Sequence, residues 1–364
     1  MAYKVALVGL GAQARSWIKA IRKHPDFEIF SVIDTDTELL ENVKKIVPEI
    51  DEDNCFLSID DLVALSSKPD VAIIITPIYT HHVLVQEAMD YNIHVICEKN
   101  MASTIYQGRQ LVQYAIDKPH LATAVGTQYR YFTEWWTVRK FFREGDCTIG
   151  DLAFIRWSAP GNWGEKRRGW RRWLQEIYIE DMMTHWFDLL RYITGMDIVQ
   201  IYCDTFIPKY SKWKGSSTAF ANVALAHKDD YNHRHNWVWA QLYGDWQKRG
   251  PCNSEFMFFC SKGEAKLNAP WGLEIKRYLD EEGYKYEEDG YLPQADIMNL
   301  GTNYTGQEII LEMVKRSIQS NGKYQPETNF KEAFKSFAVS MGAIESSRTG
   351  KAVWVPKYWQ DMNL

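Results

Sequence analysis

The sequence predicts two consecutive domains, an α/β domain with a parallel, doubly wound sheet and an α+β domain with a large, mostly antiparallel open sheet. Two observations support this fold class. In the first third of the 364 residues, short apolar runs alternate with helical patterns, which is typical of βαβ units. Beyond about Gly126, longer strand-like runs follow one another with few helices between them, which indicates antiparallel pairing. We therefore expect domains at 1–126 and 127–364, with the C-terminal helix able to pack back on the first domain.

Apolar periodicity places the individual elements. In the first domain we expect strands at 4–8, 27–33, 71–75, 93–97 and 121–125, and helices at 13–23, 37–46, 59–66, 81–91 and 103–116. In the second domain we expect strands at 152–158, 198–206, 219–227, 236–243, 254–260, 264–268 and 272–279, and helices at 177–194, 306–320 and 330–347. Ligands of parallel sheets bind at the carboxyl ends of the strands, so the residues that follow each strand of the first domain are candidates for a site.

The clearest motif joins the first expected strand to the first expected helix. Residues 9–14 read Gly9, Leu10, Gly11, Ala12, Gln13 and Ala14, which is the form Gly-x-Gly-x-x-Ala. In such a turn the first glycine permits a tight bend, the second lets the backbone approach a pyrophosphate, and the small third residue lets the helix pack closely. The helix N-terminus then offers N–H groups and a positive dipole end to the phosphates.

A signal peptide is the competing interpretation of the same residues, because Lys4 and an apolar run precede Ala12-Gln13-Ala14, which resembles a cleavage site. Two glycines interrupt that run, however, and a second strand follows and ends at Asp34. This carboxylate lies 23 residues after Gly11, close to the roughly 20 residues expected for the acid that binds an adenosine ribose. The combination favours a dinucleotide site.

The residues around Asp34 also favour NAD over NADP. A carboxylate accepts hydrogen bonds from the ribose hydroxyls and repels a 2′-phosphate. Thr35 follows it, and Asp36 adds a second acid with no arginine nearby in the sequence.

Composition excludes several classes of protein. The net charge is −5 with no sustained basic stripe, which argues against nucleic acid as a partner. No apolar run has the roughly 18 residues of a membrane span. The six cysteines are scattered without a CxxC pair, which is typical of a reduced, cytoplasmic chain. His233 and His235 lack a nearby third ligand in the sequence, so we expect no metal site.

Two turns after strands carry residues with possible chemistry. Thr76-Pro77 and His81 follow the third expected strand, and Glu98-Lys99 follows the fourth. Taken alone, the first is a capped βα turn and the second is ordinary solvated surface. At the carboxyl edge of a parallel sheet, however, a lysine can hydrogen-bond a reacting oxygen and stabilise developing negative charge.

A third candidate lies on the helix expected at 177–194. Asp181 and His185 are four residues apart, so they share one helix face, and Asp188 follows three residues later. A carboxylate one turn from a histidine can orient the ring and raise its basicity, as a general base requires. A buried structural histidine with a nearby acid is the alternative.

Taken together, these motifs resemble the glucose–fructose oxidoreductase/inositol dehydrogenase/MocA-like family of Rossmann-fold oxidoreductases. That family has Gly-x-Gly-x-x-Gly/Ala, then Thr-Pro-x-x-x-His, Glu-Lys-Pro and Asp-x-Gly-x-His-x-x-Asp, and this chain has similar residues at 9–14, 76–81, 98–100 and 181–188. The run from Val125 to Tyr131, with Gln128 and Arg130, looks like the family's crossover into the second domain. Trp170-Arg171 looks like the Trp-Arg that precedes its catalytic helix.

The resemblance implies roles for individual residues. Lys99, Asp181 and His185 would form the catalytic group: His185 would take a proton from a carbinol, Lys99 would polarise its oxygen and Asp181 would tune His185. The cofactor residues would be Gly9, Gly11, Ala12, Gln13, Ala14, Asp34, Thr35, Thr76, Pro77, His81, Glu98, Lys99 and Gln128. The substrate residues would be Lys99, Arg130, Trp163, Trp170, Arg171, Asp181 and His185.

The chain departs from the family pattern at two positions. Asn100 replaces a proline that often forms a cis bond, so Lys99 is open to a different turn, although a cis bond before a residue other than proline is costly. Met183 replaces a glycine, and a bulkier side chain there would reshape the floor of the pocket. Both departures concern the substrate more than the cofactor.

The substrate side carries a heavy aromatic load. The chain has 15 Trp and 20 Tyr, and the stretch 161–173 mixes tryptophans with five cations. Flat rings with arginines suit a sugar or an acidic sugar. Core or interface tryptophans beside a solvated basic loop are the equally weighted alternative.

The sequence therefore favours an NAD(H)-dependent oxidoreductase acting on a sugar, sugar acid or cyclitol. A glycosidase that uses tightly bound NAD in a transient redox cycle is the first alternative, and a non-catalytic dinucleotide-sensing protein is the second. The open sheet of the second domain needs a cover, so we expect a homodimer or homotetramer.

Overall fold

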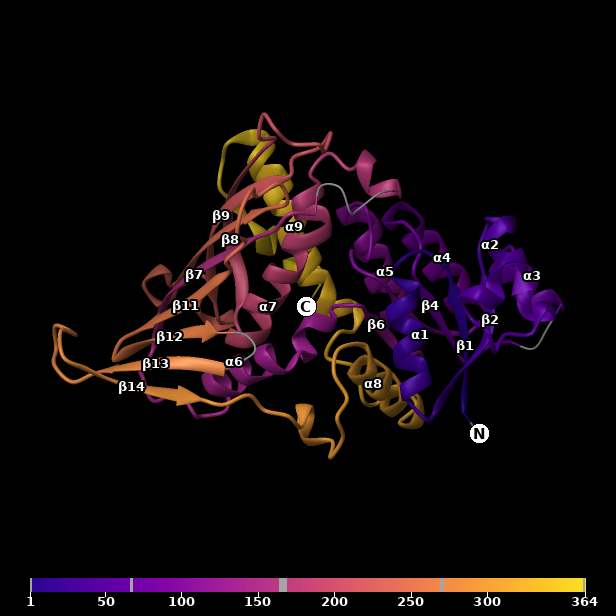
Figure 1. The fold of residues 1–364 in the computed structure, drawn as a ribbon, viewed down its shortest axis with the longest axis horizontal. Helices are drawn as coiled ribbons and strands as arrows, with labels where there is room; N and C mark the ends of the chain where they lie inside the picture. The colour runs from indigo at the N-terminus through magenta and orange to yellow at the C-terminus, as the bar shows by residue number, and fades with distance from the viewer. Residues whose placement is uncertain (1, 66–67, 164–168, 269–271, 363) are drawn as a thin grey trace. The chain divides into compact units, whose positions relative to one another are not determined.

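The computed structural model describes residues 2–65, 68–163, 169–268, 272–362 and 364. The chain forms two compact units (Figure 1). The first contains residues 1–128 and 304–337, and the second contains residues 129–303 and 338–364. The division after residue 128 lies two residues from the boundary expected from the sequence, but residues 304–337 group with the first unit instead of the second.

The first unit is built on a six-stranded parallel sheet with the order β3-β2-β1-β4-β5-β6. Its strands are β1 (Tyr3–Val8), β2 (Phe27–Ile33), β3 (Cys55–Phe56), β4 (Val71–Ile74), β5 (His94–Cys97) and β6 (Thr123–Val125). Its helices are α1 (Ala14–Lys23), α2 (Thr37–Glu41), α3 (Ile59–Leu65), α4 (Ile78–Asp90), α5 (Ile105–Asp117), α8 (Gln307–Gln319) and the first part of α9 (Phe330–Thr349). The four residues of β4 are all buried, as expected for a strand covered on both faces.

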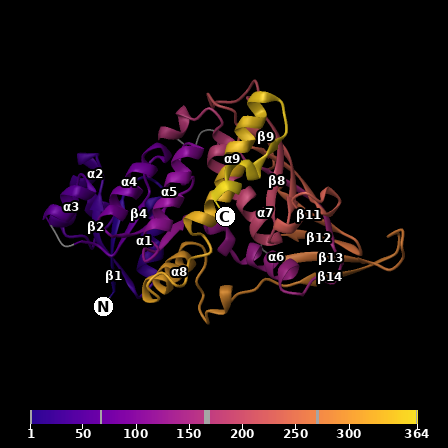
Figure 2. The same cartoon turned by 180° about the vertical axis from the view of Figure 1, so that it is seen from behind.

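The segment 304–337 joins the first unit through helix packing. Helix α8 lies beside α1, as Figures 1 and 2 both show. A Cβ atom at Gly108 of α5 would lie 2.8 Å from the ring of Phe337 and 2.9 Å from that of Phe334. Glycine at position 108 therefore lets the start of α9 approach α5 closely. This contact joins residues more than two hundred positions apart, so periodicity could not predict it.

The second unit is built on a nine-stranded sheet with the order β14-β13-β12-β11-β7-β10-β9-β8-β15. Its strands are β7 (Leu152–Pro160), β8 (Asp197–Phe206), β9 (Thr218–Ala226), β10 (Val238–Asp245), β11 (Glu255–Cys260), β12 (Gly263–Asn268), β13 (Gly272–Tyr278), β14 (Tyr286–Tyr291) and β15 (Val353–Trp354). Every neighbouring pair is antiparallel except β7 and β10, which run parallel. The predicted fold class is confirmed for both sheets.

Helices α6 (Thr133–Arg143) and α7 (Thr184–Thr194) lie on one side of this sheet (Figure 2). Between helices and sheet, Trp135 stacks on Trp157 with ring centroids 4.8 Å apart, and Phe256 meets both rings edge-on. Trp135, Trp136 and Trp157 are buried. These three tryptophans therefore fill the core, which is the structural alternative considered for the aromatic load.

The sequence prediction missed α6, β3, β14 and β15. Helix α6 buries the consecutive residues Trp135, Trp136, Thr137 and Val138 as well as Phe141, so its apolar residues do not mark a single helix face. Strand β14 is polar and almost fully exposed, so it has no apolar alternation to detect. No helix among the described residues combines the length and apolar character that crossing a membrane requires.

We predict that His94 makes the stability of the chain depend on pH. Burial lowers the pKa of His94 to about 4 from its ordinary 6.5, and its Nδ1 accepts a hydrogen bond from the Ala122 N–H at 2.9 Å. The unfolded chain therefore takes up a proton that the folded chain resists, so the free energy of unfolding falls as the pH decreases from about 6.5 to about 4. His94→Asn keeps an acceptor without this titration and should flatten the dependence.

The measurement is the thermal unfolding temperature of both proteins across this pH range. The exposed His227, changed to Asn, is the matched control and should leave the slope unchanged. Equal slopes for the native chain and His94→Asn would show that His94 does not contribute.

Candidate active site

The carboxyl edge of the first sheet gathers most of the predicted cofactor residues. The Ile75 N–H donates to the Val8 carbonyl at 2.7 Å, and the Glu98 N–H donates to the Ile74 carbonyl at 2.9 Å. The ends of β1, β4 and β5 therefore adjoin one another. The strand order also places the topological switch between β1 and β4, where open α/β sheets bind their ligands.

The glycine turn after β1 has the geometry that a pyrophosphate requires. Gly9 has a φ of +99°, and a Cβ there would lie 3.1 Å from the Thr76 amide nitrogen. Gly11 faces open space, with no atom within 4 Å of the position of a Cβ. Ala14 is buried at the start of α1, where no side chain caps the helix and the first turn has no acid. The positive end of the α1 dipole is therefore available to an anion. The residues of this turn fit the pyrophosphate of a dinucleotide.

Asp34 lies at the carboxyl end of β2 and closes one side of this turn. One carboxylate oxygen accepts the Leu10 N–H at 2.8 Å, and the other accepts the Asp36 N–H at 3.0 Å. These bonds fix the carboxylate beside the glycine turn, where the sequence spacing places a ribose-binding acid. The neighbouring Thr35 and the turn residue Ala12 are exposed, and Gln13 is half-buried.

Glu98 is buried beneath the candidate lysine. Its Oε1 accepts the Trp17 indole N–H at 2.8 Å, and its Oε2 accepts the Lys99 N–H at 3.2 Å. A Cβ at Gly126 would lie 2.9 Å from the same carboxylate, so the crossover backbone packs directly against it. Glu98 thus connects α1 to the turn that carries Lys99, which is a positioning role in this structure. Sequence reasoning missed Trp17 because nothing local links it to a partner 81 residues away.

His81 connects the two turns that follow β4 and β5. Its ring nitrogens lie 2.9 Å from the Thr76 carbonyl and 2.7 Å from the Asn100 carbonyl. The side chain is fully buried, and this burial lowers the pKa of His81 although both carbonyl contacts favour the charged ring. His81 therefore holds the Thr76 and Asn100 turns together.

The remaining residues of this edge are placed as follows. Thr76 and Pro77 are half-buried at the turn, and Gln128 is buried at the end of the first unit. Lys99 is half-buried, and the Lys99–Asn100 peptide bond is cis. The peptide bond before Asn100 thus has the cis form that the family's bond before proline often has.

In the second unit, Asp181 and His185 lie on one continuous helical segment. A π-helical turn at Ile179–Met183 carries Asp181 and leads into α7, which carries His185 and ends at Gly195 with a φ of +73°. Such π-turns are frequent at functional sites. Met183, which replaces the family's glycine, is fully buried in this turn.

Each of these two groups has a defined neighbour. The Arg171 guanidinium Nε lies 2.9 Å from Asp181 Oδ2, and Asp181 is only 2% exposed. The His185 ring stacks on Tyr129 with centroids 4.2 Å apart and planes 8° apart. Tyr129 was not singled out in the sequence, although it follows Gln128 directly. An ion pair on Asp181 and a stacked ring on His185 hold both side chains in one orientation.

Arg130 lies in a buried ion pair. Its Nε and Nη2 atoms bond the two oxygens of Asp188, each at 2.6 Å, and Arg130 is 2% exposed. These two hydrogen bonds occupy the guanidinium group of Arg130, so we omit Arg130 from the substrate contacts proposed below. Asp188 likewise has a structural role, joining α7 to the crossover segment.

The predicted aromatic substrate residues differ in exposure. Trp163 is 42% exposed, whereas Trp170 is half-buried with the Arg171 guanidinium 4.7 Å from its ring centroid. Residues 164–168 of the same loop lie outside the described residues. The rings available for stacking therefore belong to the two ends of this loop.

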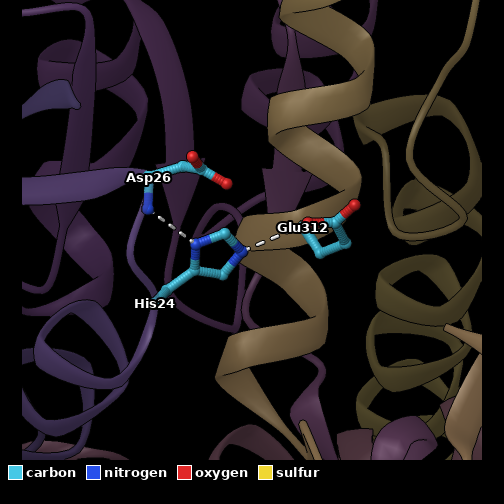
Figure 3. A group of neighbouring side chains, drawn as sticks. All are labelled: His24, Asp26 and Glu312. Atoms are coloured by element: carbon cyan, nitrogen blue, oxygen red, sulfur yellow. Dashed lines mark hydrogen bonds and ion pairs between the residues drawn. The ribbon is translucent and has the colours of Figure 1, made fainter. Parts of the chain in front are cut away.

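A separate cluster of His24, Asp26 and Glu312 has ligand atoms close enough to hold a metal ion (Figure 3). The Asp26 N–H donates to His24 Nδ1, which leaves Nε2 to donate to Glu312 at 3.3 Å. Lys315 forms ion pairs with both Asp26 and Glu312. Arg316 also pairs with Glu312. Because Lys315 and Arg316 together balance the charge of these two carboxylates, the cluster is a charge network joining α1 to α8.

Comparison with known proteins identifies the family. A model described as the oxidoreductase family with an NAD-binding Rossmann fold matches residues 3–126, and the GFO/IDH/MocA C-terminal domain matches residues 135–266. The chain therefore belongs to the GFO/IDH/MocA family of oxidoreductases, and its first unit is an NAD-binding Rossmann domain. The resemblance inferred from the motifs is confirmed.

Individual relatives are distant. Inositol 2-dehydrogenase from Corynebacterium glutamicum is 24% identical over 202 residues, which are 54% of this chain and 56% of that protein. The chain thus spans about half the length of the curated relatives it matches.

Two solved structures share the fold over nearly the whole chain. An oxidoreductase from Agrobacterium radiobacter in complex with NAD+, L-tartaric acid and magnesium has a TM-score of 0.78 at 20% identity and covers 98% of this chain and 99% of its own. The WlbA dehydrogenase from Bordetella pertussis, in complex with NADH and UDP-GlcNAcA, has a TM-score of 0.74 at 18% identity and covers 97% and 98%.

We predict that Trp17→Phe destabilises the first unit. The substitution removes the indole N–H from a buried carboxylate, and losing a partner of a buried charged group costs about 1–3 kcal/mol or more. Urea unfolding should show this loss in the free energy of unfolding. The double variant Trp17→Phe/Glu98→Gln, which lacks the buried charge, should recover part of it. A Trp17→Phe protein as stable as the native chain would contradict the positioning role of this bond.

Proposed function

We propose that this protein is an NAD(H)-dependent oxidoreductase that transfers hydride between nicotinamide and a carbinol or ketone of a sugar, sugar acid or cyclitol. The observation that carries the proposal is the position of Lys99. It lies two residues after β5, at the same carboxyl edge of the sheet as the Gly9 turn. A lysine fixed at the cofactor edge supplies the positive charge that a developing alkoxide needs.

In the proposed reaction the residues divide the chemistry between them. A bound nicotinamide accepts or donates the hydride. Lys99 donates a hydrogen bond to the carbinol oxygen, and the buried Glu98 holds the backbone of Lys99 in place through its N–H. His185 removes the hydroxyl proton, and its stacking on Tyr129 keeps the ring oriented for that transfer. The Arg171–Asp181 ion pair fixes the acid that tunes His185.

The printed ligands and names of the relatives support a polyhydroxylated substrate. They include inositol, tartaric acid and a nucleotide-linked sugar acid. All three carry secondary carbinols, and two carry carboxylates. Asp34 beside the glycine turn supports NAD over NADP as the cofactor of this chain.

We predict that Lys99→Ala and His185→Ala each lose the ability to form NADH from NAD and a sugar or cyclitol. Removing an electrostatic donor or a general base slows such steps by roughly 10²–10⁴-fold. The rate of NADH formation with a panel of polyols and sugar acids measures the loss. NAD binding, followed by fluorescence, should persist in both variants because the residues of the Gly9 turn are intact.

Two results would redirect the proposal. Full activity in both variants would remove Lys99 and His185 from the catalytic group. Release of an aglycone from a glycoside without net NADH would indicate the glycosidase, and NAD binding without turnover of any compound in the panel would indicate the non-catalytic sensor.

We also propose that two copies associate through the outer face of the large sheet. The face opposite α6 and α7 presents Phe154, Tyr202, Phe220 and Tyr243, each 36–40% exposed. Tyr243 pairs directly with Phe220 across β10 and β9, so these rings adjoin. Apolar surface of this kind on a sheet marks an interface.

We predict that Phe220→Asp converts a dimer or tetramer to monomers, because it places a charge in the centre of the buried contact. Sedimentation velocity measures the change. Tyr284→Asp, at a residue 87% exposed outside this face, is the matched control and should leave the assembly intact. An unchanged sedimentation coefficient for Phe220→Asp would contradict the proposed interface.

A further inference from the structure

Three stretches distant in the sequence converge on one edge of the second unit. Residues 169–174, 208–215 and 246–250 are joined by several contacts. The Lys212 N–H donates to Gln247 Oε1 at 3.0 Å, and the Trp213 and Trp246 rings lie 5.7 Å apart. The Lys214 ammonium lies 4.9 Å from the Trp173 ring centroid. We refer to these stretches together with Trp163, whose N–H bonds the Trp246 carbonyl, as the basic rim.

The basic rim concentrates positive charge. Its three stretches contain no Asp or Glu, although the whole chain has a net charge of −5. Apart from Arg171, its cations are Arg172, Lys209, Lys212, Lys214, Lys248 and Arg249. Within the part of the chain that the structure describes, five of these six (all but Lys212) form no ion pair with a carboxylate.

Several cations elsewhere on the surface lie beside acids. Arg22 pairs with Glu49, Arg277 with Glu287 and Lys357 with Glu345. At these positions the surface mixes the two signs of charge. The basic rim is instead a patch of one sign, which attracts anions and raises their local concentration.

Exposed rings alternate with these cations. Trp163, Trp173 and Tyr210 are 42%, 67% and 44% exposed, and the Arg249 guanidinium lies 4.5 Å from the Tyr210 ring centroid. Trp213 and Trp246 are buried beneath them and give the rim a rigid base. Flat apolar rings beside unneutralised cations offer a ligand both a stacking face and charge-assisted hydrogen bonds.

Arg171 connects the basic rim to the candidate catalytic helix. It belongs to the stretch 169–174, and its Nε bonds Asp181, one turn before His185. An ion pair therefore joins the rim directly to the helical segment that carries the proposed general base. The chemistry proposed for that helix acts on a carbinol, and an acidic sugar supplies both carbinols and carboxylates.

We propose that the basic rim binds an anionic saccharide, with its carboxylates on the lysines and arginines, its ring faces on the exposed tryptophans and tyrosine, and one end at the Asp181–His185 helix. The inference rests on the proposed function for the identity of the substrate class. It makes acidic sugars, rather than neutral sugars or cyclitols, the substrates of this chain.

The test is binding of trigalacturonate to the full chain, measured by isothermal titration calorimetry without cofactor. Binding should be at least about tenfold tighter than that of the neutral galactose trimer, because each charge-assisted contact contributes roughly tenfold or more. It should also weaken with increasing salt. Lys214→Ser/Arg249→Ser should lower the affinity by about tenfold or more on the same grounds.

Lys262→Ser/Lys285→Ser is the matched control, since it removes two exposed cations of the second unit outside the rim. It should bind as the native chain does. Equal affinity for the charged and neutral trimers, an equal loss in the control, or tighter binding of a single-stranded oligonucleotide than of trigalacturonate would each overturn the proposal. Because binding is measured without NAD, retained binding with no NADH formation would contradict the proposed function and leave the rim standing.

Discussion

The buried hydrogen bond between Trp17 and Glu98 connects the helix that follows the Gly9 turn to the turn that carries Lys99. Trp17 belongs to α1, whose N-terminus faces the Gly9 turn, and Glu98 precedes Lys99 at the end of β5. A carboxylate at 5% exposure is stable only when donors satisfy its oxygens, so the positions of α1, the Lys99 backbone and Gly126 depend on one another. The phosphate cradle and the lysine are thereby fixed to the same sheet edge. His81 adds a second tie, between the Thr76 and Asn100 turns.

The second unit follows a similar rule with different groups. Arg130 and Asp188 neutralise each other in the core beside α7, where an unpaired charge would cost several kcal/mol. The same helical segment carries Asp181, paired with Arg171, and His185, stacked on Tyr129. The buried acids Asp181 and Asp188 of this helical segment are therefore both paired with an arginine. On the basic rim, five cations have no carboxylate partner among the described residues, so they remain available to an anion.

Much of the first unit could be predicted from the sequence. The strands from Tyr3 to Val8 and from Phe27 to Ile33 are apolar runs bounded by turn residues, and their ends carry the glycine turn and Asp34. The second unit was predicted less completely. Strand β14 is too polar to show a pattern, and α6 lies among tryptophans for which a substrate-binding role and a core role were weighed equally. The family resemblance implied that Arg130 contacts substrate, and its ion pair with Asp188, 58 residues away, could not be seen locally.

The sequence by itself determined the order of the elements, the phosphate-binding turn, the acid beside it and the types of residue that follow β4 and β5. These features are local, because they follow from periodicity, turn chemistry and short spacings. Only the tertiary structure decided which polar groups form hydrogen bonds or ion pairs with other residues of the chain. It assigned Glu98 to Trp17, His81 to two carbonyls and Arg130 to Asp188, and it brought residues 169–174, 208–215 and 246–250 together as one basic surface. The physical reason is that a charge's role depends on its burial and its neighbours, and packing brings those neighbours from far along the chain.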